Sequence, residues 1–282
     1  MDGVFLGSEA LARGALTEYQ LRRHYRRLLP DVYTAKHTPV TLTDSTVAAW
    51  LWSRRKAVIA GLAASAMHGA EYVDDDEPIE LVWPNHRAPR GVITRNDTLL
   101  PGEVQTINGL SVTTPERTAF DLARRDTDGE AVAALDALVR ATRITRTDVV
   151  ALAGRHPGAR GVRRLPQVLD LVDAGSQSPR ETWLRLLLID AGFPRPVTQI
   201  PVFSPHGKPI YYLDMGWPDR MLAAEYDGEQ HRENRGRYRR DIVRSEYIAS
   251  LGWRRVRVTA GDREADIIRR VQRVWVPEQR IA

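Results

Sequence analysis

The spacing of apolar residues over the first forty positions predicts a small helical unit that ends in a hairpin. Thr17 and Gln20 have the spacing of a capping box, which predicts a helix that runs through Leu28 and stops before Pro30. Residues 31–34 then have the composition of a short strand. Helices joined by tight turns and followed by a strand are typical of a winged-helix-like module.

From residue 44 the chain passes from helical to extended spacing and back. Two apolar helices are expected at 44–54 and 57–69. Strands are expected in 79–83 and 91–95, and a hairpin turn at Asn108-Gly109 joins two further strands. Helical spacing then returns in four segments, which are 115–125, 129–141, 146–155 and 161–173.

A polar stretch at 173–179, rich in Gly and Ser and closed by a Pro, indicates a linker. We therefore expect a winged-helix-like module at 1–75, an α+β middle region at 76–173 and a C-terminal domain at 174–282.

The C-terminal domain is predicted as an α/β sandwich around a mixed sheet. The expected order is helix, three-stranded meander, helix, strand and helix. These elements are expected at 179–191, 197–203, 210–216, 221–227, about 234–250, 254–259 and 262–275.

Composition narrows the class of protein. The 282 residues are 43% hydrophobic and 27% charged, as in an ordinary globular protein. Cysteine is absent, which excludes disulfides and thiolate metal sites. The sequence has neither an apolar run of membrane-spanning length nor the pattern of a signal peptide at its start, so we expect a cytoplasmic protein without membrane contact.

Arginine is concentrated in three places along a chain whose net charge is +5. Residues 232–257 hold nine arginines against three acidic residues, and smaller clusters lie at 22–27 and 155–164. A GC-rich genome explains the choice of arginine over lysine, but it does not explain the clustering. Because the guanidinium group binds phosphate with two hydrogen bonds, we expect contact with nucleic acid. The candidate residues are Arg22, Arg23, Arg26, Arg232, Arg235, Arg237, Arg240, Arg244, Arg255 and Arg257.

Three carboxylates and a histidine, Asp214, Glu225, Asp227 and His231, lie within eighteen positions, on segments that are otherwise largely apolar or aromatic. A buried carboxylate needs a cationic partner, and a divalent metal ion is one that also supports hydrolysis. The alternative is that these are surface acids at strand ends.

Residues 176–276 resemble the PD-(D/E)XK nuclease superfamily in its very-short-patch-repair-like endonuclease branch. The resemblance rests on four motifs in order, which are Leu213–Pro218, Leu222–His231, Asp241–Arg244 and Leu251–Val258. It implies a restriction-endonuclease-like mixed sheet flanked by helices in an α/β C-terminal domain, behind an α+β N-terminal domain.

The resemblance also implies a catalytic set of Glu181, Asp214, Glu225, Asp227 and His231. Asp214, Glu225 and the backbone carbonyl of Tyr226 would hold Mg²⁺ or Mn²⁺, whose preferred ligands are oxygens. Asp227 stands where the superfamily often has a lysine, which weakens the expectation of ordinary nuclease activity. The alternative for Glu181 is that it is an acid at a helix N-terminus that stabilises the helix dipole. The alternative for His231 is that it is a loop residue without a role.

Residues 8–170 resemble the AbiEi-type antitoxin domain of abortive-infection systems. The segments that carry this similarity are Ala57–Ala64, Ile107–Thr118 and Leu135–Arg140.

Two functions follow from these patterns. The first is a Mg²⁺-dependent DNA endonuclease that acts in DNA repair or in defence against foreign DNA. The alternative is a non-catalytic DNA-binding antitoxin or transcriptional regulator with an inactive nuclease fold. DNA is the expected partner in both, and a second copy of the chain and a cognate toxin are further candidates.

Overall fold

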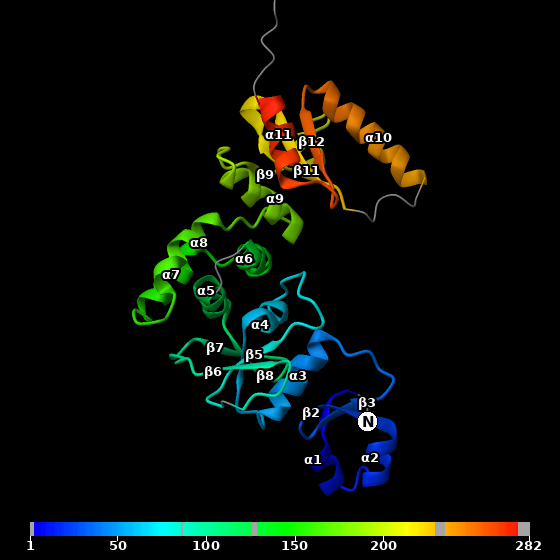
Figure 1. The fold of residues 1–282 in the computed structure, drawn as a ribbon, viewed down its shortest axis with the longest axis vertical. Helices are drawn as coiled ribbons and strands as arrows, with labels where there is room; N and C mark the ends of the chain where they lie inside the picture. The colour runs from blue at the N-terminus through cyan, green and yellow to red at the C-terminus, as the bar shows by residue number, and fades with distance from the viewer. Residues whose placement is uncertain (1–2, 86, 126–128, 229–234, 276–282) are drawn as a thin grey trace, which may run out of the picture. The chain divides into compact units, whose positions relative to one another are not determined.

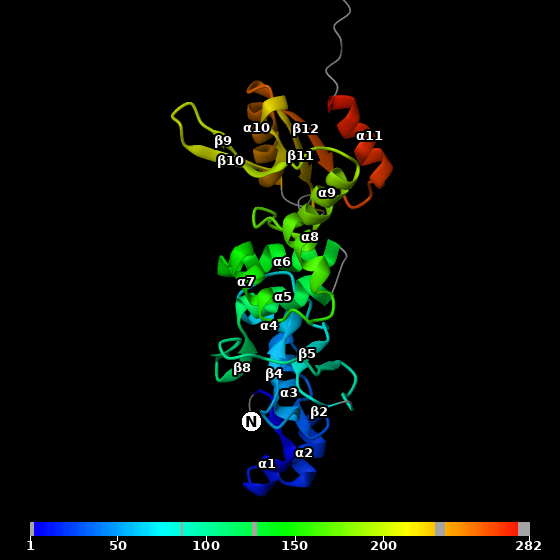
Figure 2. The same cartoon turned by 90° about the vertical axis from the view of Figure 1, so that its left-hand side faces the viewer.

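The computed structural model describes residues 3–85, 87–125, 129–228 and 235–275, with side chains of 235–239 excepted. Residue contacts divide the chain into two units, Met1–Asp170 and Leu171–Ala282. Figure 1 colours the chain from one terminus to the other, and Figure 2 shows the same elements after a quarter turn. Both units combine helices with sheets, as the mixed α/β prediction requires.

The first unit begins with a small three-stranded sheet and short helices. Its elements are β1 (Phe5–Leu6), α1 (Gly7–Ala12), α2 (Glu18–His24), β2 (Tyr25–Leu29) and β3 (Val32–Ala35). The strands have the order β1-β3-β2. The capping box predicted from Thr17 and Gln20 is present at the start of α2.

The predicted extension of this helix through Leu28 is wrong, because α2 ends at His24. Residues 25–29 are extended and pair antiparallel with β3. The turn between them holds Asp31 at a φ of 63°. Edge pairing satisfies the backbone N–H and C=O groups of this segment better than a last helical turn that would run into Pro30.

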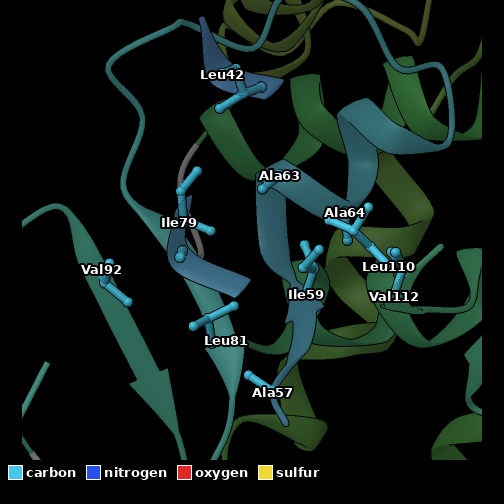
Figure 3. Close-up of a cluster of buried hydrophobic side chains, with 11 residues drawn as sticks. Leu42, Ala57, Ile59, Ala63, Ala64, Ile79, Leu81, Val92, Leu110 and Val112 are labelled. Carbon is cyan, nitrogen blue, oxygen red and sulfur yellow. The ribbon is translucent and has the colours of Figure 1, made fainter. Parts of the chain in front are cut away.

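A five-stranded sheet forms the centre of the first unit, in the order β6-β5-β4-β8-β7. Its strands are β4 (Val58–Ala60), β5 (Ile79–Val82), β6 (Val92–Arg95), β7 (Val104–Ile107) and β8 (Leu110–Thr113). Helices α3 (Leu42–Trp52) and α4 (Gly61–Met67) belong to the same part of the chain. Figure 3 shows side chains of these strands gathered with those of α4 into one apolar core.

The helix predicted for 57–69 begins as a strand instead. β4 lies between β5 and β8 in the sheet, and Ile59 is fully buried there, so only 61–67 are helical. A short apolar run has the same composition in a buried strand as in a buried helix. The predicted boundary at residue 75 consequently falls between strands of one sheet.

Helices α5 (Pro115–Arg125), α6 (Gly129–Thr142), α7 (Arg146–Gly154) and α8 (Leu165–Leu171), with a 3₁₀ turn η1 (Val162–Arg164), follow the sheet. Figures 1 and 2 show α5, α6 and α7 gathered on one side of it. The single helix predicted for 161–173 is therefore a 3₁₀ turn followed by a shorter helix.

The second unit contains a four-stranded sheet of order β12-β11-β10-β9. Its elements are α9 (Pro179–Asp190), β9 (Val197–Phe203), β10 (Pro209–Trp217), η2 (Pro218–Arg220), β11 (Leu222–Tyr226), α10 (Arg235–Ser250), β12 (Arg254–Val258) and α11 (Glu264–Trp275). The β11–β12 pair is parallel and the other pairs are antiparallel, so the sheet is mixed.

Helices cover both faces of this sheet. Ala224 packs with side chains of α9 and α11, whereas Ala223, its neighbour in β11, packs with Ile248 of α10. Successive side chains of a strand point to opposite faces, so α10 lies opposite the other two helices, as Figure 2 shows for α10 and α11. Over the part of the chain described here, no helix combines the length and apolar character needed to cross a membrane.

Candidate functional site

The predicted acidic residues meet where β10 and β11 run side by side. Met215 pairs with Ala224 in this antiparallel ladder, so Asp214 and Glu225 occupy the next pair of positions. Tyr226, whose carbonyl was predicted as a metal ligand, donates its backbone N–H to Oδ2 of Asp214 at 2.8 Å. The Asp214 side chain therefore bridges the two strands.

Glu225 is enclosed by two arginines. Its side chain is almost fully buried, with 5% of the residue exposed. Oε1 accepts a hydrogen bond from Nη2 of Arg244 at 2.5 Å, and Oε2 accepts one from Nη1 of Arg255 at 2.9 Å. Charge-assisted hydrogen bonds to both oxygens hold this carboxylate in a fixed orientation.

Asp214 lies in a less favourable electrostatic environment. Burial, together with the nearby charges of Glu181 and Glu225, raises its pKa from 3.8 to about 7, against the opposing effects of the Tyr226 N–H and of Arg244. Asp214 of β10 is thus a buried carboxyl group that also experiences the charges of Glu181 of α9 and Glu225 of β11.

Glu181 also has a structural role. Its Oε2 accepts the backbone N–H of Gln177 at 2.8 Å, and its Oε1 accepts the Ser178 hydroxyl at 3.1 Å. Ser178 in turn accepts the backbone N–H of Glu181 as the N-cap of α9. Glu181 thus forms hydrogen bonds at the N-terminus of α9, as expected of a helix N-terminal acid. Its charge also contributes to the raised pKa of Asp214.

Asp227, at the position where the superfamily often has a lysine, is engaged by an arginine. Nη2 of Arg257 lies 2.7 Å from Oδ2 of Asp227, and its Nη1 lies 3.1 Å from Oδ2 of Asp241. Burial alone would lower the pKa of Arg257, but the two aspartates outweigh it and raise the pKa. Asp241 therefore contacts Arg257 of β12, and Arg244 contacts Glu225 of β11, instead of the two pairing with each other.

The carboxylates do not form a ready metal site in this arrangement. Within the described residues, no group of three Asp, Glu or His side chains has the spacing needed to hold a metal ion. Both oxygens of Glu225 are already bound by guanidinium groups, which would compete with a cation. The residues therefore do not fit a resident Mg²⁺ ion unless Glu225 first leaves its arginines.

Four of the predicted site residues have no described side chain. His231 and Arg232 lie outside the described residues, and Arg235 and Arg237 are placed only as backbone in the first turns of α10. Arg240 is exposed on the same helix.

The arginine cluster of the first unit lies on α2 and β2. Arg22, Arg23 and Arg26 are all exposed. Nη2 of Arg22 lies 3.5 Å from Oε2 of Glu18, and both side chains are more than 70% exposed, so this pair holds the arginine only weakly. Nη1 of Arg23 donates to the Tyr19 hydroxyl at 3.0 Å. Tyr19 is itself 64% exposed. Tyr19 carries no charge and so is not part of the arginine pattern, although its position four residues before Arg23 places both on one helical face.

Residues 49–171 match the model of the AbiEi antitoxin C-terminal domain. The match confirms the antitoxin-type resemblance over this part of the first unit, and it ends before the segment that resembles the nucleases. Two proteins from two strains of Mycobacterium tuberculosis, MT2308 and Rv2248, both described as uncharacterized, are 29% identical to this chain over 199 residues. The aligned region covers 71% of this chain and 73% of each relative.

Proposed function

We propose that this protein is a DNA-binding regulator of the antitoxin kind. In this proposal α2 enters the major groove and the β2–β3 hairpin acts as the wing of a winged-helix module. The observation that carries the proposal is the exposure of Arg22, Arg23 and Arg26 on α2 and the adjoining strand. α2 has seven residues and is therefore about 10 Å long, which suits insertion into the major groove.

The domain that follows this module supports the proposal. Residues 49–171 match a domain described as part of an antitoxin, and the arginine-bearing segment precedes it in the chain. A DNA-contacting module joined to an antitoxin domain is suited to a protein that regulates transcription and binds a cognate toxin. The toxin is accordingly the second partner we propose.

The second unit has a non-catalytic role in this proposal. We infer a restriction-endonuclease-like fold whose acidic positions are neutralised by arginines. Glu225 and Asp227 are held by Arg244, Arg255 and Arg257. Salt bridges of this kind stabilise the sheet. Among the described residues, no group of three carboxylates is placed to hold a metal ion.

The first test measures binding to a mixed-sequence 30-base-pair duplex over a range of salt concentrations. We expect the triple variant Arg22→Ala, Arg23→Ala, Arg26→Ala to bind at least about tenfold more weakly at 0.1 M salt. The slope of log K against log salt should fall in magnitude by about 3, because each lost phosphate contact removes about 1 from it.

The matched control removes three exposed arginines of the second unit, Arg263, Arg269 and Arg273, and so changes the net charge equally. It should bind as the unsubstituted protein does. Equal weakening in both variants would show that only net charge matters and would contradict a DNA-binding role for α2.

A metal-dependent DNA endonuclease is the second function we consider, because Asp214, Glu225 and Glu181 interact electrostatically. The regulator proposal predicts no nicking of supercoiled plasmid in Mg²⁺ or Mn²⁺ above a buffer control. Nicking that is abolished by both Asp214→Asn and Glu225→Gln would instead establish the nuclease, with Glu225 leaving its arginines when the ion binds.

A further inference from the structure

A pocket of about 900 Å³ opens within the first unit, and none of the α2 or β2 arginines lines it. Its walls come from the end of β6, the end of α5 and the loop 157–164. The loop contains Gly158 and Gly161 and three arginines. The sequence shows this arginine cluster, but only the fold shows that it faces a hollow.

The inner wall of the pocket is rich in charge but electrically balanced. Three arginines that line it, Arg95, Arg124 and Arg125, form salt bridges with three carboxylates: Asp97, which also lines the pocket, and Glu80 and Asp121, which do not. Arg124, for example, lies 2.8 Å from Oδ1 of Asp97 and 2.8 Å from Oδ1 of Asp121. Burial alone would raise the pKa of Asp97, but Arg125 and Arg124 outweigh it and lower the pKa. The wall is therefore a fixed ionic network without excess charge.

The rim of the pocket carries the excess charge. Arg160, Arg163 and Arg164 line it and are exposed, and among the described residues no carboxylate lies within salt-bridge distance of any of them. Within the described part of the chain, the pocket therefore presents three arginines without a carboxylate partner, beside a neutral wall. Their local density raises the concentration of anions at the opening.

The loop that bears these arginines is anchored to the wall. Nη1 of Arg124 donates to the carbonyl oxygen of Arg160 at 3.2 Å. Gly161 has a φ of 84°, and a Cβ at this position would collide with the carbonyl oxygen of Arg124. Close approach of the two backbones thus requires glycine, and it fixes the backbone of the loop that carries the three arginines.

We propose that this pocket binds a ligand that carries several phosphate groups. Three guanidinium groups around a concave polar surface match the charge and the hydrogen-bond geometry of clustered phosphates. No aromatic side chain lines the pocket in the described part of the chain, so the phosphates, and not a stacked base, are what it recognises. A nucleotide, inorganic polyphosphate and a nucleic-acid backbone all supply this chemistry.

The test measures binding of tripolyphosphate, ATP and a single-stranded 12-mer DNA to the full chain by calorimetry. We expect at least one of them to bind, and the triple variant Arg160→Ala, Arg163→Ala, Arg164→Ala to raise its Kd about 100-fold, since a charge-assisted hydrogen bond contributes about tenfold and exposure reduces the sum. Binding of tripolyphosphate and ATP alone would identify a small ligand, and binding of the 12-mer alone a nucleic-acid backbone.

Two further variants keep the result interpretable. The triple lysine variant at the same three positions retains charge but loses the planar guanidinium, and it should bind with an intermediate Kd. The variant without Arg263, Arg269 and Arg273 should bind as the unsubstituted chain does. Three outcomes would overturn the proposal: no binding of any phosphate ligand, an unchanged Kd in the alanine variant with an unaltered circular dichroism spectrum, or tighter binding of poly-glutamate, which would indicate an acidic protein segment.

Discussion

Replacement of Arg117 by alanine is expected to lower the free energy of unfolding of the first unit by about 3–5 kcal/mol, the range for breaking a buried ion pair. Arg117 lies on α5 and is 1% exposed. Its Nη1 lies 2.6 Å from Oε2 of Glu103 and 2.7 Å from the carbonyl oxygen of Thr98, and its Nε lies 3.0 Å from Oδ2 of Asp121. The guanidinium thus joins the loop before β7 to α5.

The loss of stability arises because the substitution leaves two buried carboxylates without their main cationic partner. Glu103 and Asp121 are fully buried, so their charges would lose their main compensation without gaining water. Glu103 retains a hydrogen bond with Nε2 of His156 at 2.7 Å, and Asp121 retains Nε of Arg124 at 2.9 Å. These remaining partners place the expected loss towards the lower end of the range.

Chemical denaturation of the full chain, followed by circular dichroism, measures this loss. The control is Arg146→Ala, which removes an exposed arginine whose partner Asp170 is also exposed, and which should cost no more than about 1 kcal/mol. If Arg117→Ala is no more destabilising than this control, the network does not hold the first unit together.

Replacement of Asp214 by asparagine is expected to stabilise the second unit at pH 8, by up to about 4 kcal/mol, and to have little effect near pH 4. Burial and the charges of Glu181 and Glu225 raise the pKa of Asp214 from 3.8 to about 7. The folded chain therefore holds this proton more tightly than the unfolded chain does. Stability falls as the pH rises from about 4 to about 7, where the folded group loses its proton.

Asparagine removes this dependence because it stays neutral and can still accept the Tyr226 N–H through its amide oxygen. Thermal unfolding between pH 4 and pH 8 in the presence of a chelator measures the difference between the two proteins. Asp219→Asn is the control, since its side chain is 77% exposed in the same unit. A difference between Asp214→Asn and the unsubstituted chain that stays constant across this range would refute the raised pKa of Asp214.

Local signals predicted some elements well and misplaced others. The capping box of Thr17 and Gln20 was confirmed because it depends on contacts within one turn of helix. The end of that helix was misplaced because β2 is extended through its pairing with β3. β4 was misread as helix for the same reason, since its strand state depends on β5 and β8, which follow it in the chain.

The candidate site divides in a similar way. The order of the motifs predicts that Asp214 and Glu225 lie on neighbouring antiparallel strands, and the structure has them there. It did not indicate that Arg244 from α10 and Arg255 from β12 would occupy both oxygens of Glu225. Arginines at this spacing look alike in sequence whether they face phosphate or a carboxylate of their own chain.

The sequence by itself determined the order of elements in the second unit, the positions of its acidic residues and the clustering of arginine, because these depend on local spacing and composition. The tertiary structure alone decided which arginines are neutralised by carboxylates and which are not. Electrostatic pairing depends on distance and burial in space, so Arg255 is bound to Glu225 whereas Arg163 lines the open pocket.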